Sequence, residues 1–493
     1  MGLSGTNSAG GGAGSGGGEQ WSAAWELLLP SVGAPARGRG RALRSALREA
    51  VRSGRLAAGT RLPASRELAA DLGVSRGLVT DAYEQLTAEG YLRAGRGAGT
   101  WVAAVGAVEP ARADAGAVQE VPEVDFKPGT PDLSLFPRAA WTAAQRRALG
   151  AMPHRALGYP DPRGLPELRV ALAELLARRR GVAADARRLV VCSGVAQAMT
   201  LLGLVLYGRG QRLAATEDPG SPPHAAQLTA VGVRCVGVGL DGEGIRSGEL
   251  AASGAQVAVL TPAHQFPSGV ALSARRRAEL LEWVRSPAGR DGRLIVEDDY
   301  DGDFRYDRAP VGALQGLDPA RIAYCGSVSK SLAPGLRLGW LVVPEALVAE
   351  VVAHKSRLDM GNSVIDQAAF ADLLVSGEYD RQLRRCQRAY RARRDALVAA
   401  LAGELPGAQV SGIAAGLHVV VALPAPYGPE SRLVAAAARA GVRVMGLSAY
   451  GRAEVGDGPA GGDGRARLVL GYAHLAPGDI ARGVAVLARA WRA

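Results

Sequence analysis

Hydrophobic and polar positions follow helical spacing in the first part of the chain. Apolar residues four apart predict a helix over residues 41–51. Ser65 is expected to cap a second helix that Gly73 ends, and Ser75 to cap a third that runs to about Glu89. Two helices joined by a short turn that contains glycine predict a helix-turn-helix.

A hairpin is expected directly after these helices. Residues 90–92 and 99–102 are short strand-like stretches around a glycine-rich tip, which is typical of the wing of a winged helix. The last helix would then enter the DNA major groove by its N-terminal end, and neighbouring basic residues would reach the flanking backbone or the minor groove. The expected DNA contacts are Ser75, Arg76 and Thr80 on that end, with Arg66 and Arg96 beside it. The alternative is a small helical packing module, because a helix–glycine–helix pattern alone is common.

Beyond residue 122, apolar runs alternate with helical stretches such as 168–179 and 381–401. Short apolar runs between helices predict buried parallel strands in an α/β sandwich, with a smaller C-terminal subdomain. The strands are expected at 189–191, 257–260, 294–296 and 338–343.

The composition is that of a soluble globular chain, with 48% hydrophobic and 21% charged residues in 493. That length predicts two or more domains. The uncharged run Leu189–Tyr207 has the length of a membrane span, but Ser193 and Gly194 near its start indicate a strand, a turn and a helix instead. Four cysteines lie far apart without a CxxC pair, so we expect a reduced, cytoplasmic protein with no disulfide framework and no metal site.

Four segments follow from these patterns. We expect a disordered Gly/Ser-rich leader over 1–20, a DNA-binding domain over 21–102, a linker over 103–122 and a large α/β domain over 123–493. Between residues 37 and 102, twelve arginines face six acidic residues, which is a net +6. This local excess of positive charge favours a polyanionic partner such as double-stranded DNA.

Lysine is rare in this chain. Of 58 basic residues only three are lysines: Lys127, Lys330 and Lys355. Arginine stays protonated, whereas a lysine amine can lose its proton and attack an aldehyde. Lys330 lies among Ser327, Ser329 and Arg337, which are residue types that bind phosphate. The hypothesis is therefore Schiff-base chemistry with a phosphorylated aldehyde, although a lone lysine is usually only a surface residue.

Three further motifs fit the same chemistry. Residues 193–197 follow a strand and open a helix, so their N–H groups could hold a phosphate. Residues 297–300, Glu-Asp-Asp-Tyr, end another strand, where a carboxylate could keep a pyridine nitrogen protonated and a phenol could bond the ring oxygen. A calcium loop is excluded because Phe304 stands where its glycine belongs, but a solvated acidic loop stays open. Arg467, at the start of a late strand, is a candidate clamp for a substrate carboxylate or an ordinary strand-edge charge.

Residues 54–102 closely resemble the winged helix-turn-helix of the GntR family. The match rests on Gly-Thr-Arg-Leu-Pro-Ala-Ser-Arg-Glu-Leu-Ala from Gly59, Leu-Gly-Val-Ser-Arg from Leu72, and Glu-Gly-Tyr-Leu from Glu89. The resemblance implies DNA binding by the residues that match the family's contacts. These are Arg66, Ser75, Arg76, Arg96 and Gly97.

Residues 123–493 look like a fold-type I aminotransferase, and the order of the parts resembles the MocR/GabR regulators. The resemblance rests on Thr-Pro-Ala-His-Gln-Phe-Pro-Ser-Gly from Thr261, Glu-Asp-Asp-Tyr-Asp from Glu297 and Ser-Lys-Ser-Leu-Ala-Pro-Gly-Leu-Arg from Ser329. It implies that Lys330 binds pyridoxal 5'-phosphate as an imine, Asp298 pairs with the pyridine nitrogen, Tyr300 bonds the ring hydroxyl and Arg467 binds an amino acid's carboxylate. It further implies a homodimer and a set of phosphate-binding residues: Gly194, Val195, Ala196, Ser327, Ser329, Arg337 and, reaching the other subunit's site, Tyr159.

Three positions depart from the family pattern. Ser221 stands where an aromatic residue usually stacks on the cofactor ring, and Phe266 stands where working aminotransferases carry an asparagine. Both departures argue against efficient turnover. Gln382 stands where the family commonly carries a histidine, and the sequence alone indicates no consequence of this change.

The sequence therefore predicts a dimeric transcription regulator that senses pyridoxal phosphate, or an amine or amino acid that reacts with it, through Lys330. At most weak or partial transamination is expected. Two alternatives stay open: a true aminotransferase with an attached DNA-binding head, and a scaffold that binds no cofactor.

Overall fold

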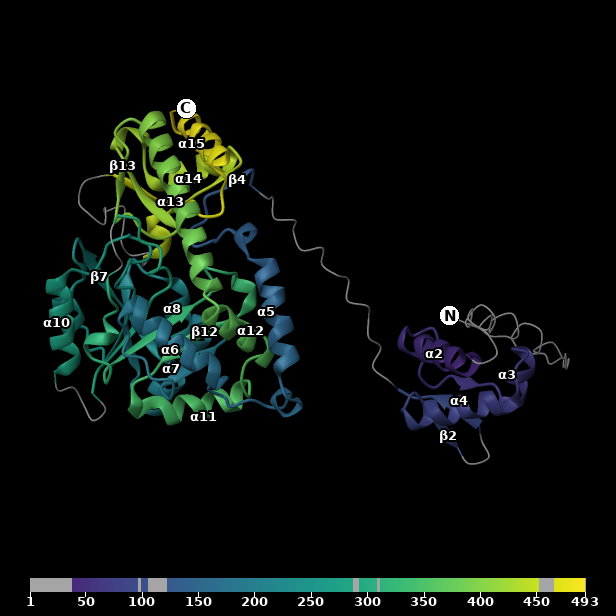
Figure 1. Ribbon diagram of the computed structural model, residues 1–493. Helices are drawn as coiled ribbons and strands as arrows, with labels where there is room; N and C mark the ends of the chain where they lie inside the picture. The colour runs from purple at the N-terminus through teal and green to yellow at the C-terminus, as the bar shows by residue number, and fades with distance from the viewer. Residues whose placement is uncertain are drawn as a thin grey trace, which may run out of the picture. The chain divides into compact units, whose positions relative to one another are not determined.

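The chain forms two compact units, Met1–Glu120 and Val121–Ala493, and each is described by itself (Figure 1). The computed structural model describes residues 38–95, 99–104, 122–286, 292–307, 311–451 and 465–492. The predicted leader, the wing tip and most of the predicted linker lie outside these ranges. Within them, no helix combines the length and the apolar character needed to cross a lipid bilayer.

The small unit is a winged helix, as the hydrophobic pattern predicts. Its elements are α2 (Arg39–Arg52), β1 (Arg61–Leu62), α3 (Ser65–Asp71), α4 (Arg76–Ala88), β2 (Leu92–Gly95) and β3 (Gly99–Val102). The three strands pair in the order β1-β3-β2. Leu47, Leu68, Val79 and Leu86 point from the helices into one core that is closed to water. Burial of these apolar faces, rather than helix propensity, stabilises helices this short.

The predicted cap of the second helix is one residue off. Ser65 is the first residue of α3, and Ala64 occupies the N-cap position in extended backbone. Alanine has no side-chain acceptor, so Glu67 completes the cap by accepting a hydrogen bond from the Ala64 N–H at 3.0 Å. The other prediction is confirmed, because Ser75 caps α4 and its hydroxyl accepts from the Leu78 N–H at 3.3 Å.

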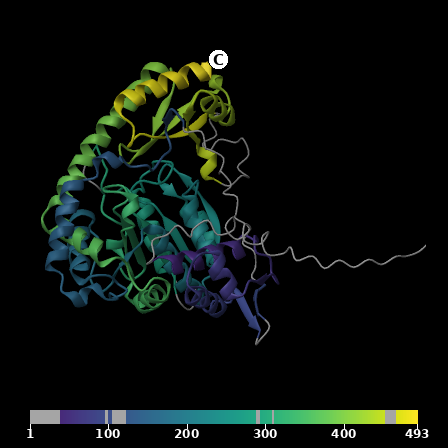
Figure 2. The same ribbon diagram turned by 90° about the vertical axis from the view of Figure 1, so that its right-hand side faces the viewer.

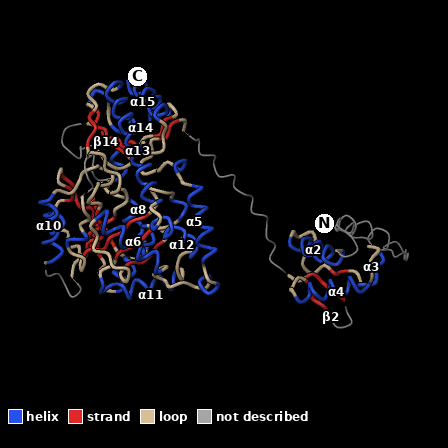
Figure 3. The backbone as a smooth tube through the Cα atoms, in the orientation of Figure 1, coloured by secondary structure: helices blue, strands red, loops and turns tan. Residues whose placement is uncertain are grey.

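The large unit is built on an eight-stranded, mainly parallel sheet with helices on both faces (Figure 3). The strand order is β5-β12-β11-β10-β9-β6-β7-β8. The bounds are β5 (Leu189–Cys192), β6 (Leu213–Asp218), β7 (Arg234–Asp241), β8 (Gly244–Ile245), β9 (Val257–Leu260), β10 (Leu294–Asp298), β11 (Ile322–Ser327) and β12 (Gly339–Val342).

The helices divide between the two faces of this sheet because its central strands are apolar on both sides. One face packs against α7 (Val195–Gly208), α8 (Pro222–Ala230) and α11 (Val348–Leu358). The other packs against α6 (Pro166–Arg180), α9 (Ser247–Ala252), α10 (Ala274–Arg285), α12 (Val364–Val375) and α13 (Glu378–Glu404). The predicted strand, turn and helix over 189–207 are confirmed as β5 and α7.

One predicted parallel strand runs the other way. β12 is antiparallel to both β11 and β5, with Ser327 paired to Gly339. A parallel connection needs a crossover of a dozen or more residues, usually a helix. The 328–338 connection contains only a short 3-10 turn, so the chain reverses direction instead.

A smaller layer closes the C-terminal part of the large unit. It consists of a four-stranded sheet, in the order β13-β14-β17-β16, and a two-stranded parallel pair of β15 with β4. The bounds are β4 (Val124–Asp125), β13 (Gln409–Ser411), β14 (His418–Leu423), β15 (Val442–Arg443), β16 (Met445–Gly446), β17 (Ala466–Gly471), α14 (Glu430–Arg439) and α15 (Pro477–Arg492). The long helix α13 joins this layer to the large sheet, while α5 (Arg138–Ala151) packs against α12 (Figures 1 and 2).

Leu47→Ala should destabilise the small unit alone. Leu47 is fully buried in the core of that unit, and removing such a side chain costs about 2–5 kcal/mol. We expect calorimetry of the full chain to show one transition shifted to lower temperature and the larger one unchanged. Leu468→Ala, an equally buried leucine of the large unit, should shift only the other transition. If either change moves both transitions, the two units unfold together.

Candidate functional site

The proposed site residues gather where the strands of the large sheet end. β5, β6, β10 and β11 all end at the same edge of the sheet, because they run in the same direction. Open α/β sheets bind ligands at this carboxyl edge. The motifs that follow these four strands begin at Ser193, Pro219, Asp299 and Val328, so the fold brings distant parts of the sequence to one place.

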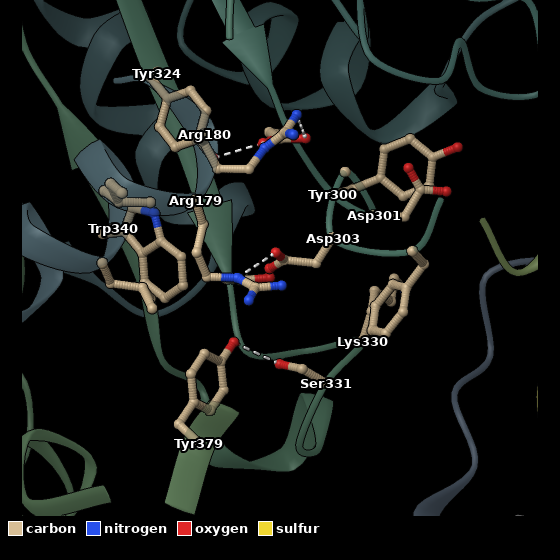
Figure 4. A pocket seen from close by; sticks show the side chains of 16 residues that line it. Arg179, Arg180, Tyr300, Asp301, Asp303, Tyr324, Lys330, Ser331, Trp340 and Tyr379 are labelled. Carbon is tan, nitrogen blue, oxygen red and sulfur yellow. Dashed lines mark hydrogen bonds and ion pairs between the residues drawn. The ribbon is translucent and has the colours of Figure 1, made fainter. Parts of the chain in front are cut away.

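Lys330 lies at this edge beside a pocket that also contains Tyr300, Asp301 and Ser331 (Figure 4). Its Nζ donates a hydrogen bond to the carbonyl oxygen of Gly129 at 2.5 Å. Burial lowers the pKa of the amine, although the carboxylates of Asp298 and Asp301 act in the opposite direction. A buried amine of lowered pKa is a better nucleophile at moderate pH than an ordinary lysine.

Asp298, the last residue of β10, is buried with one oxygen satisfied and one not. Oδ2 lies 2.8 Å from Nε2 of His224 on α8. Oδ1 has no hydrogen-bond partner among the described residues. An unpaired buried carboxylate oxygen is costly, and a protonated pyridine nitrogen would satisfy it. Asp298 therefore offers the hydrogen-bond acceptor that its expected partner, the pyridine nitrogen of the cofactor, requires.

Tyr300 belongs to a buried hydrogen-bonded group that the sequence does not reveal. The Nδ1 atom of His264 lies 2.8 Å from Asp301 Oδ2 and 3.1 Å from the Tyr300 hydroxyl. Burial, together with Asp301, raises the pKa of Tyr300 well above its usual value. The phenol therefore stays protonated and can donate a hydrogen bond, as its expected role at a ring oxygen requires.

Three of the expected phosphate-binding residues lie in one turn, and Arg337 packs against that turn from the segment after β11. Gly194 precedes α7 with a φ of +86°, a conformation that favours glycine. A Cβ on Gly194 would lie 3.2 Å from the Arg337 guanidinium, and that guanidinium also donates to the Ser193 carbonyl oxygen. The first N–H groups of α7, on Val195 and Ala196, lie in the same turn, and a helix N-terminus next to an arginine suits a phosphate. The Ser327 hydroxyl accepts from the Ser329 N–H at 3.4 Å.

Two predicted residues come from other parts of the large unit. Tyr159 is 86% exposed in the single chain. Arg467 pairs with Ala422, four residues along β17 from Gly471, which pairs with His418 at the site. At roughly 3.3 Å per residue, the Arg467 Cα is about 13 Å from Gly471. The carboxylate-binding role of Arg467 stays a prediction.

Two of the three departures from the family pattern lie next to site residues, Ser221 along the chain and Phe266 in space. Ser221 immediately precedes α8, which carries His224. The Phe266 ring packs edge-on against Tyr300, His418 and Tyr450, at centroid distances of 5.9, 5.3 and 5.2 Å.

Gln382, the third departure, has a physical consequence in the structure. Its amide donates to the carbonyl oxygens of Leu135 and Ser331, at 3.0 and 3.1 Å, so it fixes the backbone next to Lys330 from α13.

Sequence reasoning missed His224, His264 and Gly129 as site residues. One sequence signal pointed to His224, which lies about one helical turn after Ser221. Ser221 stands at the position where the family usually carries the aromatic residue that stacks on the cofactor ring. Gly129 offered none, because its contribution is a backbone carbonyl oxygen.

In the small unit, Arg66, Ser75 and Arg76 are exposed and Thr80 is half-buried. Ser75, Arg76 and Thr80 lie at the N-terminal end of α4, whose opposite side buries Val79 and Tyr83. Arg96 and Gly97 lie outside the described residues.

Each of the two units matches a known protein family. Residues 124–461 match the family described as aminotransferase class I and II, and residues 40–102 match the bacterial regulatory proteins of the gntR family. The HTH-type pyridoxine biosynthesis transcriptional regulator PdxR of Corynebacterium glutamicum is 32% identical over 408 residues, covering 82% of this chain and 87% of that protein. The probable rhizopine catabolism regulatory protein MocR of Rhizobium meliloti is 33% identical over 380 residues, covering 73% and 76%.

Solved structures resemble the large unit. The multiple substrate aminotransferase of Thermococcus profundus superposes with a TM-score of 0.65 at 24% identity, covering 76% of this chain and 92% of that one. LysN of Thermus thermophilus, an α-aminoadipate aminotransferase complexed with N-(5'-phosphopyridoxyl)-L-leucine, gives 0.63 at 26%, covering 75% and 92%.

The large unit thus has the fold of the class I and II aminotransferases, joined to a GntR-type winged helix-turn-helix. The chain belongs to the MocR/GabR-type transcriptional regulators, as the sequence predicts.

The reactivity of Lys330 toward pyridoxal phosphate should reflect its lowered pKa. Only the neutral amine attacks an aldehyde, so we expect the rate of imine formation to rise through a midpoint below the value near 10.5 that is usual for lysine. The measurement is the absorbance change on mixing cofactor-free protein with pyridoxal phosphate across a range of pH. Lys330→Ala should lose this phase and retain only slow reaction at exposed amines. A midpoint at or above the usual lysine value would contradict the burial argument.

Proposed function

We propose that the protein is a transcriptional regulator whose large unit binds pyridoxal 5'-phosphate at Lys330 and whose small unit binds double-stranded operator DNA. The observation that carries this proposal is the desolvated Lys330 amine at the sheet edge where one oxygen of the buried Asp298 carboxylate has no partner among the described residues. Its relatives PdxR and MocR are named as regulators. Binding to chromosomal DNA places its action in the cytoplasm.

The residues at the site fit this cofactor. Asp298 Oδ1 is available for the ring nitrogen, the protonated Tyr300 hydroxyl for the ring oxygen, and the turn at Gly194 with Arg337 for the phosphate. When bound, pyridoxal phosphate supplies an aldehyde that condenses with primary amines and a ring that withdraws electrons. LysN, which shares this fold, is complexed with a phosphopyridoxyl compound.

The signal is the cofactor itself or an amine or amino acid that reacts with it. A ligand amine that took the place of the Lys330 amine on the cofactor would free that side chain, whose Nζ lies within hydrogen-bonding distance of the Gly129 carbonyl oxygen. Arg467 is the proposed partner of a ligand carboxylate. A ligand changes the DNA affinity only by the difference between its affinities for the two states of the protein.

A homodimer is part of this proposal. Tyr159 is a large aromatic residue that is 86% exposed in the single chain, and we propose that it completes the phosphate site of the partner subunit.

A working aminotransferase is the second candidate, since Lys330 could also serve as its proton-transferring base. Phe266 weighs against it, because an apolar ring packed on Tyr300 and His418 cannot make the hydrogen bonds of the asparagine usual in working aminotransferases. Conversion of an amino acid with a keto-acid acceptor over many turnovers, abolished by Lys330→Ala, would favour the enzyme.

Ligand-gated DNA binding is the decisive expectation. We would titrate the DNA upstream of the protein's own gene by fluorescence anisotropy, with cofactor-free protein, with pyridoxal phosphate, and with pyridoxal phosphate plus each of a panel of amino acids. The dissociation constant should shift roughly 5- to 150-fold with one of these ligands, the range of typical allosteric coupling. Lys330→Ala should bind the same DNA without the shift. Binding that is indifferent to every ligand would remove the sensing role and favour the enzyme.

Arg76→Ala should weaken DNA binding without affecting the large unit. Arg76 is exposed at the N-terminal end of α4, the end expected to enter the major groove. Losing one phosphate contact should reduce the salt dependence of binding by about one unit, and losing a base contact should lower specificity. Arg52→Ala, at the C-terminal end of α2, serves as the matched control. Unchanged affinity in Arg76→Ala would mean that α4 is not the recognition helix.

A further inference from the structure

Lys355 is a lysine buried so completely that none of its surface is exposed. It lies on α11, and its Nζ donates to three acceptors: Asp359 Oδ2 at 2.8 Å, Asn362 Oδ1 at 2.8 Å and Gln197 Oε1 at 3.3 Å. An ammonium group has three donors, and all three are used here. A buried charge is tolerated when it is paired and hydrogen-bonded in this way.

Two of these acceptors also hold Ser193, the residue directly before the proposed phosphate-binding turn. The Gln197 Oε1 that contacts Lys355 also accepts from the Ser193 N–H at 2.7 Å. The Asn362 amide donates to the Ser193 hydroxyl at 2.8 Å, and Arg337 donates to the Ser193 carbonyl oxygen. Every polar atom of Ser193 is therefore fixed, and two of these contacts depend on side chains that Lys355 holds.

The same network reaches the segment that carries Tyr159. Gly361, with a φ of +113°, lies in the turn that Asp359 and Asn362 form, and a Cβ there would lie 2.7 Å from the Pro160 ring. Gln367 links the turn to this segment a second time. Its amide donates to the Asn362 carbonyl oxygen at 2.9 Å, and its oxygen accepts from the Leu165 N–H at 2.8 Å.

We propose that Lys355 is a positioning residue for the cofactor phosphate. Through Gln197 and Asn362 it holds the turn at Ser193–Gly194 in the conformation that binds the phosphate. Through the turn at residues 359–362 it holds the Tyr159 segment that is proposed to complete the partner subunit's site. This inference rests on the proposed function, since it requires that pyridoxal phosphate binds at Lys330.

The chemistry of the network explains why this position keeps a lysine in a chain where 55 of the 58 Lys and Arg residues are arginines. The three acceptors converge on one atom, which suits a compact ammonium. A planar guanidinium spreads five donors over a wider fork and would not fit this closed space.

The test compares two aldehydes that differ only in the phosphate. Full-length, cofactor-free Lys355→Met is titrated with pyridoxal phosphate and with pyridoxal, following imine absorbance. We expect the affinity for pyridoxal phosphate to fall roughly tenfold or more, the effect of losing charge-assisted hydrogen bonds. The affinity for pyridoxal should stay the same, so the preference for the phosphorylated aldehyde falls by the same factor. Arg357→Met, which removes a charge from the exposed side of the same helix, should retain the wild-type preference.

The outcomes separate the two proposals. Wild-type protein that binds no pyridoxal phosphate overturns the proposed function and this inference with it. Wild-type binding that Lys355→Met retains, or an equal loss for both aldehydes, overturns only the role of Lys355. If Lys355→Met does not fold, Asn362→Ala provides the same test. It keeps the Lys355–Asp359 ion pair and removes the amide that links Lys355 to the Ser193 hydroxyl, and the preference for the phosphorylated aldehyde should again fall.

Discussion

Parallel hydrogen bonding between β9, β10 and β11 is the constraint on which the site depends. Pairing of Asp298 with Cys325 fixes where the acidic motif ends relative to the segment that carries Lys330. Because these strands run the same way, their carboxyl ends and the residues that follow them share one edge. The antiparallel β12 adds to the same edge, since a reversed strand begins where its neighbours end. Arg337, two residues before β12, is thereby brought to Gly194, and a Cβ on Gly339 would lie only 2.8 Å from the Gly194 Cα.

The exclusion of water from this edge sets the properties of its ionisable groups. Burial lowers the pKa of Lys330 and raises the pKa of Tyr300, which keeps the amine reactive and the phenol protonated. It lowers the pKa of His418 to about 3, so this imidazole is neutral. Among the described residues Asp298 Oδ1 has no partner. A buried acceptor left unpaired costs about 1–3 kcal/mol, and a ligand that supplies a partner recovers that free energy on binding.

The departures from the aminotransferase pattern point in one direction. Phe266 fills space among Tyr300, His418 and Tyr450 with ring edges rather than hydrogen bonds. Gln382 stabilises the backbone beside Lys330 from the long helix α13. An apolar ring at the Phe266 position, together with a braced backbone at Lys330, suits the proposed sensor better than a catalyst. The proposed role of Lys355 belongs to the same pattern, because Lys355 would support binding of the phosphate without touching a reacting atom.

The sequence alone determined the local elements and the family. Apolar spacing and capping residues define α2 and α4, and the motifs around Asp298 and Lys330 identify the aminotransferase fold. These features were predictable because they depend on neighbours within a few residues. The role of Arg467 at a ligand carboxylate, which the family resemblance implies, stays a prediction. The sequence did not determine the direction of β12, the pairing of His224 with Asp298, or the link from Lys355 to Ser193. Only the tertiary structure decides such contacts, because they join residues distant in sequence and depend on strand direction and register, which no local pattern encodes.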